Sequence, residues 1–205
     1  MELSRRSLLG ATAAGMVLAA CARPTADSDL NGILDQLATD FLRESPEYAT
    51  SLAVSEEQAG GRYIDRLSDY SRAGAERTLQ IARAAQTRMQ ALSRDTLEAR
   101  DAVTYDVVNA ALTDNIASAA YKTGGGAQSP YTVTQLTGSY TNVPDFLASQ
   151  HPVTNREQAD AYLARLTAYG RVLDQESERI ALDAGEGVIP PDFTIDGALR
   201  QLGAF

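Results

Sequence analysis

The helical pattern of this chain is interrupted by QSPYTVTQLTGSYTNVPDFLASQH, residues 128–151. Between Lys122 and Arg156 the one charged residue is Asp145, although 22% of the whole chain is charged. The Thr, Tyr and Val residues of this run favour extended backbone, and three prolines stop a helix from running through it, Pro130, Pro144 and Pro152. We call residues 128–151 the neutral segment, and we predict a crossover that is buried or lines a cleft.

Two interpretations of the neutral segment remain open. In the first, its extended backbone accepts a peptide as an added strand, and its hydroxyl, amide and imidazole groups orient that peptide without requiring a charge on it. The candidate substrate-binding residues are then Tyr131, Gln135, Tyr140, Asn142 and His151. None of them is assigned as a catalytic residue. In the second interpretation the segment is a buried crossover whose hydroxyls are satisfied by neighbouring backbone.

Metal binding is not predicted for this chain. It contains one histidine, His151, and one cysteine, Cys21. A zinc site normally takes three or four protein ligands, and His151 precedes a proline, which favours extended backbone over a mid-helix position. No Ser-His-Asp, Cys-His or paired-carboxylate arrangement can be assembled from the sequence either.

The first twenty residues have the pattern of an export signal. Arg5 and Arg6, followed by leucines, match a twin-arginine signal, and the uncharged run after them is too short to span a bilayer. The run ends in Leu-Ala-Ala-Cys, which resembles a lipobox with Cys21 as the lipidated residue. We predict a signal peptide over 1–20 and a lipidated tether over 21–28. The alternative is an ordinary signal with an incidental cysteine.

Composition restricts the partners that this chain can take. Its net charge of −9 disfavours nucleic acid, which requires a basic face, and it disfavours electrostatic binding to an anionic membrane. Attachment to a membrane is therefore expected through lipid on Cys21. The hydrophobic fraction of 44% suffices for a packed core. We expect an exported protein, anchored at the periplasmic side of the bacterial cell envelope.

The remaining chain, 29–205, is predicted to be mainly α, a helical array or bundle crossed by the neutral segment. Apolar residues recur at helical spacing, and Ser, Pro and Gly residues mark the helix ends. A capping box is predicted at Asp95 and Glu98, and another at Thr154 and Glu157. The expected helices are 29–44, 46–54, 72–92, 95–121, one or two turns over 143–149, 155–183, and a last one from Asp192.

Four sequence words resemble a family of exported bacterial proteins, the domain of unknown function 885 (DUF885). They are FLRESPEYATSLAV (41–54), RLSDYS (66–71), SPYTVTQLTGSYTNVPDFLASQHPV (129–153) and GVIPPDF (187–193). Members of that family are similar to zinc metallopeptidases of the gluzincin type. They are longer than this chain and carry H-E-x-x-H in their C-terminal part, where zinc and a glutamate would activate water.

This chain contains no H-E-x-x-H. The resemblance therefore implies the N-terminal helical portion of a larger metallopeptidase-like fold, with zinc expected in the missing part and no activity expected of these 205 residues alone. The chain would contribute one wall of a peptide-binding cleft. The alternative function is that of a complete, non-enzymatic helical lipoprotein that binds a partner or small ligand at the envelope.

Overall fold

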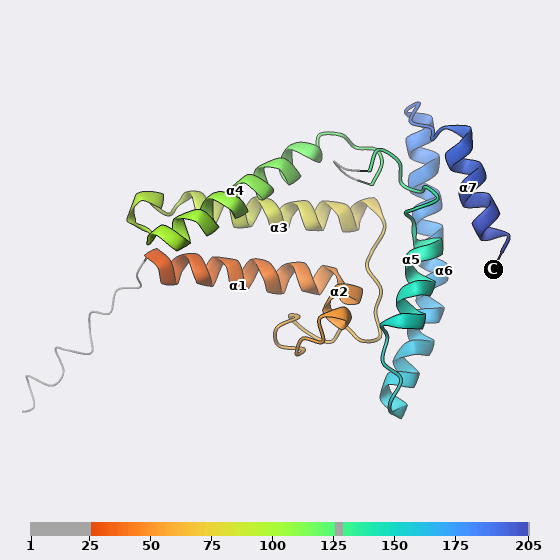
Figure 1. Ribbon diagram of the computed structural model, residues 1–205, viewed down its shortest axis with the longest axis horizontal. Helices are drawn as coiled ribbons and strands as arrows, with labels where there is room; N and C mark the ends of the chain where they lie inside the picture. Colours follow the sequence, from red (N-terminus) through yellow and green to blue (C-terminus); the bar gives the residue numbers. More distant parts are fainter. Residues whose placement is uncertain (1–25, 126–128, 205) are drawn as a thin grey trace, which may run out of the picture.

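The computed structural model describes residues 26–125 and 129–204, and this part of the chain is mainly helical, as predicted (Figure 1). The predicted signal peptide 1–20, with Arg5 and Arg6, and Cys21 lie outside the described residues. Within the described ranges there is no β-strand. The elements are α1 (Ala26–Glu44), α2 (Pro46–Ser51), α3 (Arg72–Gln90), the 3-10 turn η1 (Arg94–Thr96), α4 (Ala99–Ser118), α5 (Ser139–Ser149), α6 (Arg156–Gly185) and α7 (Asp192–Leu202).

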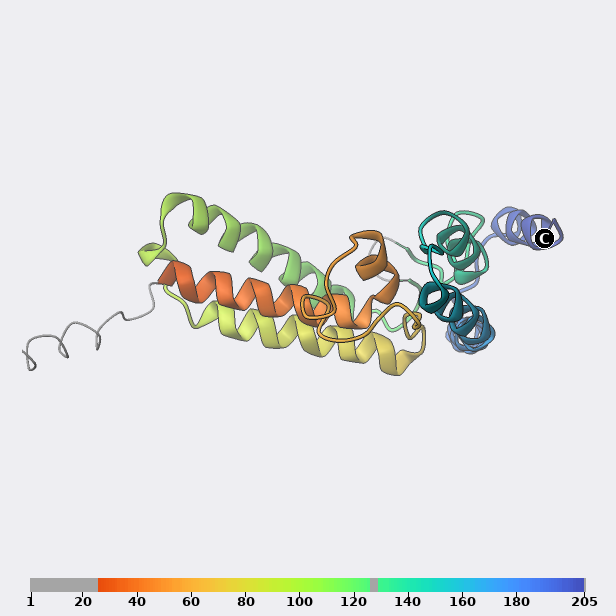
Figure 2. The ribbon, with the colours of Figure 1, turned by 90° about the horizontal axis from the view of Figure 1, so that it is seen from below.

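Helices α1, α3 and α4 lie side by side and form the first of two groups (Figures 1 and 2). Their shared core is small and aliphatic, because α3 contributes two buried alanines and a methionine where its neighbours approach. The buried core residues are Leu30, Ala82, Ala85, Met89 and Leu112. The arginines of α3 lie outside this core, on the solvent-exposed side of the helix.

Helices α5, α6 and α7 form the second group, which runs crosswise to the first (Figure 1). Val143, Phe146 and Leu147 of α5 are buried against Val172 of α6, with the two α6 tyrosines Tyr162 and Tyr169 packed around them. These tyrosines are therefore core residues, as the spacing of α6 predicts. Leu67, from the chain between α2 and α3, completes this second core.

Residues 52–71, which we call the connector, link α2 to α3 and contact both helical groups. The beginning of the connector turns through Ala59 and packs with Leu42 of α1 and Ala49 of α2 in a third, smaller core. Gly60 takes a φ of +68°, a conformation that strains residues with a side chain. The connector then passes without regular structure to α3. It lies between the two helical groups, so its side chains can contact both.

The neutral segment differs from its prediction in its second half. Residues 129–138 are irregular, with a turn closed by Thr134 and Thr137, but helix α5 begins at Ser139 and continues through Pro144 to Ser149. The expected one or two turns are thus a three-turn helix, and Pro144 does not stop it. The reason is burial, since Val143 and Phe146 on either side of the proline are held against α6, and this packing outweighs the missing backbone hydrogen bond.

The predicted helix starts are shifted at three places. Helix α1 begins at Ala26, so the last three residues of the predicted tether are helical. The N-cap of α4 is Glu98 and not Asp95, because residues 94–96 form a 3-10 turn of their own. At α6 the cap is Asn155, whose Oδ1 accepts from Gln158 N at 2.9 Å, while Gln158 Oε1 accepts from Thr154 N at 2.8 Å. The capping box at Thr154 and Glu157 is therefore wrong by one residue.

Among the helices of the described ranges, none combines the length and the apolar character that a bilayer crossing requires.

Candidate functional site

Arg165 of α6 is the buried residue around which the candidate site is built. Its side chain has no solvent exposure, and its guanidinium donates to Arg66 O at 2.8 Å, to Tyr63 O at 3.1 Å and to Thr50 Oγ1 at 2.8 Å. Burial lowers its pKa to about 10, although nearby carboxylates oppose this. One α6 side chain thus fixes α2 and the middle of the connector.

His151 is a further partner of this arginine rather than a free imidazole. Its Nδ1 lies 2.6 Å from Arg165 Nη1 and its Nε2 lies 2.9 Å from the carbonyl oxygen of Gln158. Since a guanidinium can only donate, Nδ1 accepts and Nε2–H donates, which is the neutral tautomer. The ring also packs edge-on against Tyr162 at 5.5 Å between centroids. His151 is buried and joins the end of α5 to α6.

Glu176 of α6 performs a similar task at the beginning of α5. Its two carboxylate oxygens each accept from the backbone N of Ser139 at 2.9 Å, and one also accepts from the Ser139 hydroxyl. Burial raises the pKa of Glu176, while these hydrogen bonds and Arg179 oppose the rise. A carboxylate at a helix N-terminus is favourably placed in the helix dipole, so Glu176 caps α5 in place of the missing side-chain cap.

Tyr140 and Gln135 of the neutral segment contact α7. The Tyr140 hydroxyl lies 2.6 Å from Gln201 Oε1 and 3.0 Å from Thr134 O, and its side chain is buried. Gln135 packs so closely on Gly197 that a Cβ added there would lie 2.9 Å from its own Cβ. Gln135 Oε1 is buried with no hydrogen-bond partner among the described residues. Both residues hold the last helix against the segment.

The five candidate residues from the sequence are therefore not brought together. Tyr131 is half-buried, and its carbonyl accepts from Ser129 Oγ at 2.9 Å. Asn142 is exposed on α5 and lines an open cleft. Of the five residues, Asn142 alone belongs to the lining of that cleft.

The cleft lies between α2, the end of the connector and α5, and has a volume of about 440 Å³. We call it the α2–α5 cleft. Its apolar floor is made by Val143 and Phe146, and Phe146 rests on the Arg165 guanidinium at 4.8 Å from its ring centroid. At the mouth, Ser51 donates to Gln150 Oε1 and so links α2 to the end of α5. The full lining is Ser45, Glu47, Tyr48, Ser51, Ser68, Tyr70, Asn142, Val143, Phe146 and Gln150.

The polar groups of this cleft include one carboxylate and no cation. Glu47 accepts from Ser68 N at 3.0 Å and from Ser68 Oγ at 2.5 Å, and a carboxylate has lone pairs left for a ligand. The Tyr70 hydroxyl has no hydrogen-bond partner among the described residues. Burial raises the pKa of Tyr70, with Glu47 and Glu176 adding to the rise, so this hydroxyl keeps its proton at neutral pH. The cleft can therefore offer both a donor and an anionic acceptor.

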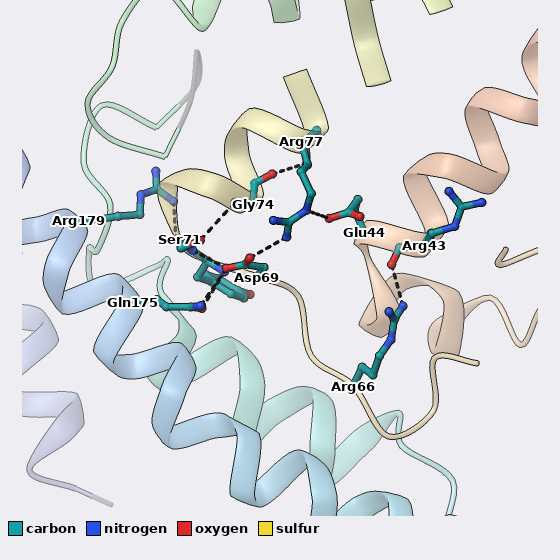
Figure 3. Close-up of polar contacts among 11 residues, drawn as sticks. Arg43, Glu44, Arg66, Asp69, Ser71, Gly74, Arg77, Gln175 and Arg179 are labelled. Atoms are coloured by element: carbon teal, nitrogen blue, oxygen red, sulfur yellow. Dashed lines mark hydrogen bonds and ion pairs between the residues drawn. The ribbon is translucent and has the colours of Figure 1, made fainter. Parts of the chain in front are cut away.

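Asp69 connects the cleft wall to α3 and α6 through hydrogen bonds of its carboxylate (Figure 3). It lies between the two lining residues Ser68 and Tyr70, and its carboxylate accepts from Arg77 Nη2 of α3 at 2.6 Å and from Gln175 Nε2 of α6 at 2.9 Å. Burial raises its pKa, but hydrogen bonds from Ser71 and Arg77 outweigh this and lower it to about 2. The connector is thus fixed to both helical groups at this residue.

Sequence reasoning missed most of the cleft, but one signal could have found it. All ten lining residues fall within three of the four words that carry the family resemblance, 41–54, 66–71 and 129–153. The words are far apart in sequence and meet in space because Arg165 and Asp69 draw the connector towards α6. Residues that share a recognisable word and a cleft are the stronger candidates for a functional site.

A second hollow of about 450 Å³ lies between the connector and the beginning of α6. Its charged side chains largely neutralise one another. Arg62 pairs with Asp65 at 3.0 Å and with Glu157 at 2.7 Å, and Arg156 lies 3.6 Å from Asp160. These side chains are mostly solvent-exposed, so this hollow is a solvated surface depression and not a comparable candidate.

Within residues 26–125 and 129–204, no group of three His, Cys, Asp or Glu side chains could hold a metal ion. The zinc that the family resemblance implies is expected in the C-terminal part of the longer family members and not in these residues.

A family model described as "Bacterial protein of unknown function (DUF885)" matches residues 46–205. No curated protein matches the chain. Among solved structures, one described as "the putative lipoprotein from Colwellia psychrerythraea" is similar to it with a TM-score of 0.79 at 16% identity, over 89% of this chain and 32% of that one. At this identity the likeness shows the fold. The chain spans about a third of the length of that solved structure.

Proposed function

We propose that this chain, which belongs to the bacterial DUF885 family, is the N-terminal helical part of a longer, exported, lipid-anchored hydrolase, and that the α2–α5 cleft binds part of a peptide substrate. The observation that carries the proposal is the position of the ten lining residues. All of them lie in words that resemble the family, and the fold uses a buried arginine and a pinned aspartate to bring those words together.

The chemistry of the cleft suits a short peptide. Its volume lies in the range of small-ligand sites, roughly 300–1,000 Å³. Phe146 and Val143 offer an apolar floor for a side chain, Asn142 can both donate to and accept from a peptide bond, and the Tyr70 hydroxyl can donate to a carbonyl. Glu47 is the one carboxylate in the lining, so a free amino terminus or a basic side chain is the group that it would attract.

The peptidase assignment comes from the resemblance to gluzincin-type zinc enzymes. Zinc and the H-E-x-x-H glutamate would both belong to the part of the longer protein that follows residue 205. There, zinc would polarise the scissile carbonyl and activate water. The residues of this chain bind and orient the substrate and exclude water from the apolar floor, and none of them acts as a catalytic base.

Anchoring at the envelope is the second part of the proposal. Cys21 follows a lipobox-like sequence behind the twin-arginine pair Arg5 and Arg6, and the similar solved structure is described as a "putative lipoprotein". Lipid on Cys21 would hold the helical part close to the membrane on its periplasmic side. The net charge of −9 disfavours any added attraction to anionic lipid headgroups.

The test begins with the gene downstream of codon 205. The longer product is purified, its zinc content is measured, and KM and kcat are determined for tetrapeptides with free and with acetylated amino termini. Tyr70→Phe should raise KM several-fold while the melting temperature stays the same, because its hydroxyl has no partner within the described protein. Tyr140→Phe is the matched control, since its hydroxyl is bonded internally, and it should lower stability with unchanged KM.

A complete helical lipoprotein that binds a small ligand without catalysis is the second candidate. One observation favours it: ten residues from three separate parts of this chain already form the α2–α5 cleft. Binding of the same tetrapeptides to residues 22–205, together with a stop codon after residue 205 and no H-E-x-x-H downstream, would establish this second function and refute the hydrolase. Unchanged KM in Tyr70→Phe would remove the cleft from both proposals.

A further inference from the structure

The outward side of α6 carries an apolar seam that the described protein leaves uncovered. Its residues follow the alternating three- and four-residue spacing by which one helix packs along another. They are Leu163, Leu166, Gly170, Leu173, Ser177 and Ile180. Leu163 is 59% exposed, Leu166 43% and Ile180 41%. The seam extends along α6 for about 27 Å at the usual helical rise.

A neighbouring side of α6 is the one used inside this chain. Arg165, Val172, Glu176 and Asp183 are buried there and hold α5, the connector and the segment before α5. A solvated face of a helix normally carries charged residues. On α6 these charges, such as Asp174 and Glu178, lie beside the seam and not within it. The seam therefore has the composition of an interface and not of a surface.

Gly170 lies within the seam and suits the close approach of another helix. A glycine in the middle of an exposed helix costs about 1 kcal/mol relative to alanine, and a Cβ added at Gly170 would meet nothing within 4 Å. Nothing in the described chain therefore explains the glycine. Close approach of another backbone does explain it, because only a residue without a side chain lets two helices come that near.

We propose that this α6 seam is the docking surface for a helix from the part of the longer protein that follows residue 205. The inference rests on the proposed function in that it requires the longer chain. The similar solved structure supports this occupant, because 89% of the present chain accounts for 32% of that chain. The larger remaining part can supply helices that this chain lacks, and an uncharged seam of this length fits an apolar helix packed along α6.

Thiol labelling tests the seam without any need for activity. The chain has one cysteine, so in a Cys21→Ser background without other cysteines a single thiol is introduced by Ser177→Cys in the seam or by Asp174→Cys beside it. Both variants are made in the 205-residue chain and in the longer protein. The thiol at position 177 should react with a maleimide about ten-fold more slowly in the longer protein, as expected for a packed surface that is exposed by local opening. The thiol at position 174 should react equally in both.

Substitution of two glycines by alanine, one in the seam and one outside it, gives the second measurement. Gly170→Ala should raise the melting temperature of the 205-residue chain by roughly 3 °C through helix propensity, and it should lower that of the longer protein because the new methyl group obstructs the approach. Gly32→Ala in α1 is the control, since Gly32 is also exposed with nothing within 4 Å of an added Cβ. It should stabilise both proteins alike.

Three results would overturn the inference. Equal labelling of position 177 in the two proteins, in a longer protein that hydrolyses peptides, refutes the seam and leaves the proposed function intact. A concentration-dependent dimer of the 205-residue chain with position 177 protected assigns the seam to a second copy. A gene without further coding sequence after residue 205 removes the occupant, and in that case the proposed hydrolase is refuted as well.

Discussion

Asp69→Asn should destabilise the protein, because Asp69 fastens the connector to both helical groups. The ordinary pKa of 3.8 is lowered to about 2 in the folded protein, which corresponds to about 2.4 kcal/mol without solvent screening. The Asp69 side chain is 30% exposed, so we expect a loss of about 1 to 1.5 kcal/mol at pH 7. Asparagine keeps the shape and the acceptor oxygen, and it removes the charge that faces Arg77.

The pH dependence of this loss distinguishes the charge from packing. A carboxylate with a lowered folded-state pKa contributes its full stability above the unfolded pKa, and the contribution is lost as pH falls through the folded value. The difference in unfolding free energy between wild type and Asp69→Asn should therefore be constant from pH 7 to 5, fall to about half near pH 3 and disappear below about 2.

Urea unfolding of residues 22–205, followed by far-ultraviolet circular dichroism, measures these differences. Asp106→Asn is the control, because Asp106 forms a two-point pair with Arg94 on the open surface and such pairs contribute little. An Asp69→Asn protein as stable as wild type at pH 7, or one whose deficit is the same at pH 3 as at pH 7, would refute the role we assign to this carboxylate.

Three further perturbations test other parts of the protein. Arg165→Met should cost about 3 kcal/mol, because it leaves several buried acceptors of α2 and the connector without donors, whereas the exposed Arg171→Met on the same helix should stay within about 0.5 kcal/mol in the same unfolding assay; equal effects would contradict the anchoring role. Cys21→Ser should release the protein from the membrane fraction, and Arg5→Lys with Arg6→Lys should block export; continued attachment of the Cys21→Ser protein in fractionated cells would show that the lipobox interpretation is wrong.

The helices that could be predicted from the sequence are those whose formation depends on the local spacing of apolar residues. The pattern in α1 and α6, and the Ser-Pro-Glu at the start of α2, specify helix and helix start within a few residues. The sequence predicts too short a helix at α5, because Pro144 argues against a helix more strongly than the apolar residues around it argue for one. Tyr140, Val143, Phe146 and Leu147 do follow helical spacing, and their burial against α6 decides the conformation.

The candidate site could be predicted only in part, and the reason lies in how its polar side chains pair within the fold. A sequence shows which residues can form hydrogen bonds and does not show which bonds are already formed inside the fold. His151 and Tyr140 have the chemistry of ligand contacts, yet Arg165 and α7 already occupy them. The sequence alone does not distinguish Glu47 from other helix residues or Tyr70 from other connector residues. Both became candidates only when the buried contacts of α6 placed them around one opening.

The position of α6 late in the chain has a consequence for synthesis. The segments that it holds are all made before it on the ribosome, and their hydrogen-bond partners on α6 are Arg165, Gln175, Glu176, Arg179 and Asp183. Until α6 has emerged, the connector and the neutral segment lack these α6 partners, while α1, α3 and α4 already possess a core of their own. A nascent chain stalled before residue 156 should therefore protect the backbone amides of those three helices from exchange and leave the walls of the α2–α5 cleft unprotected.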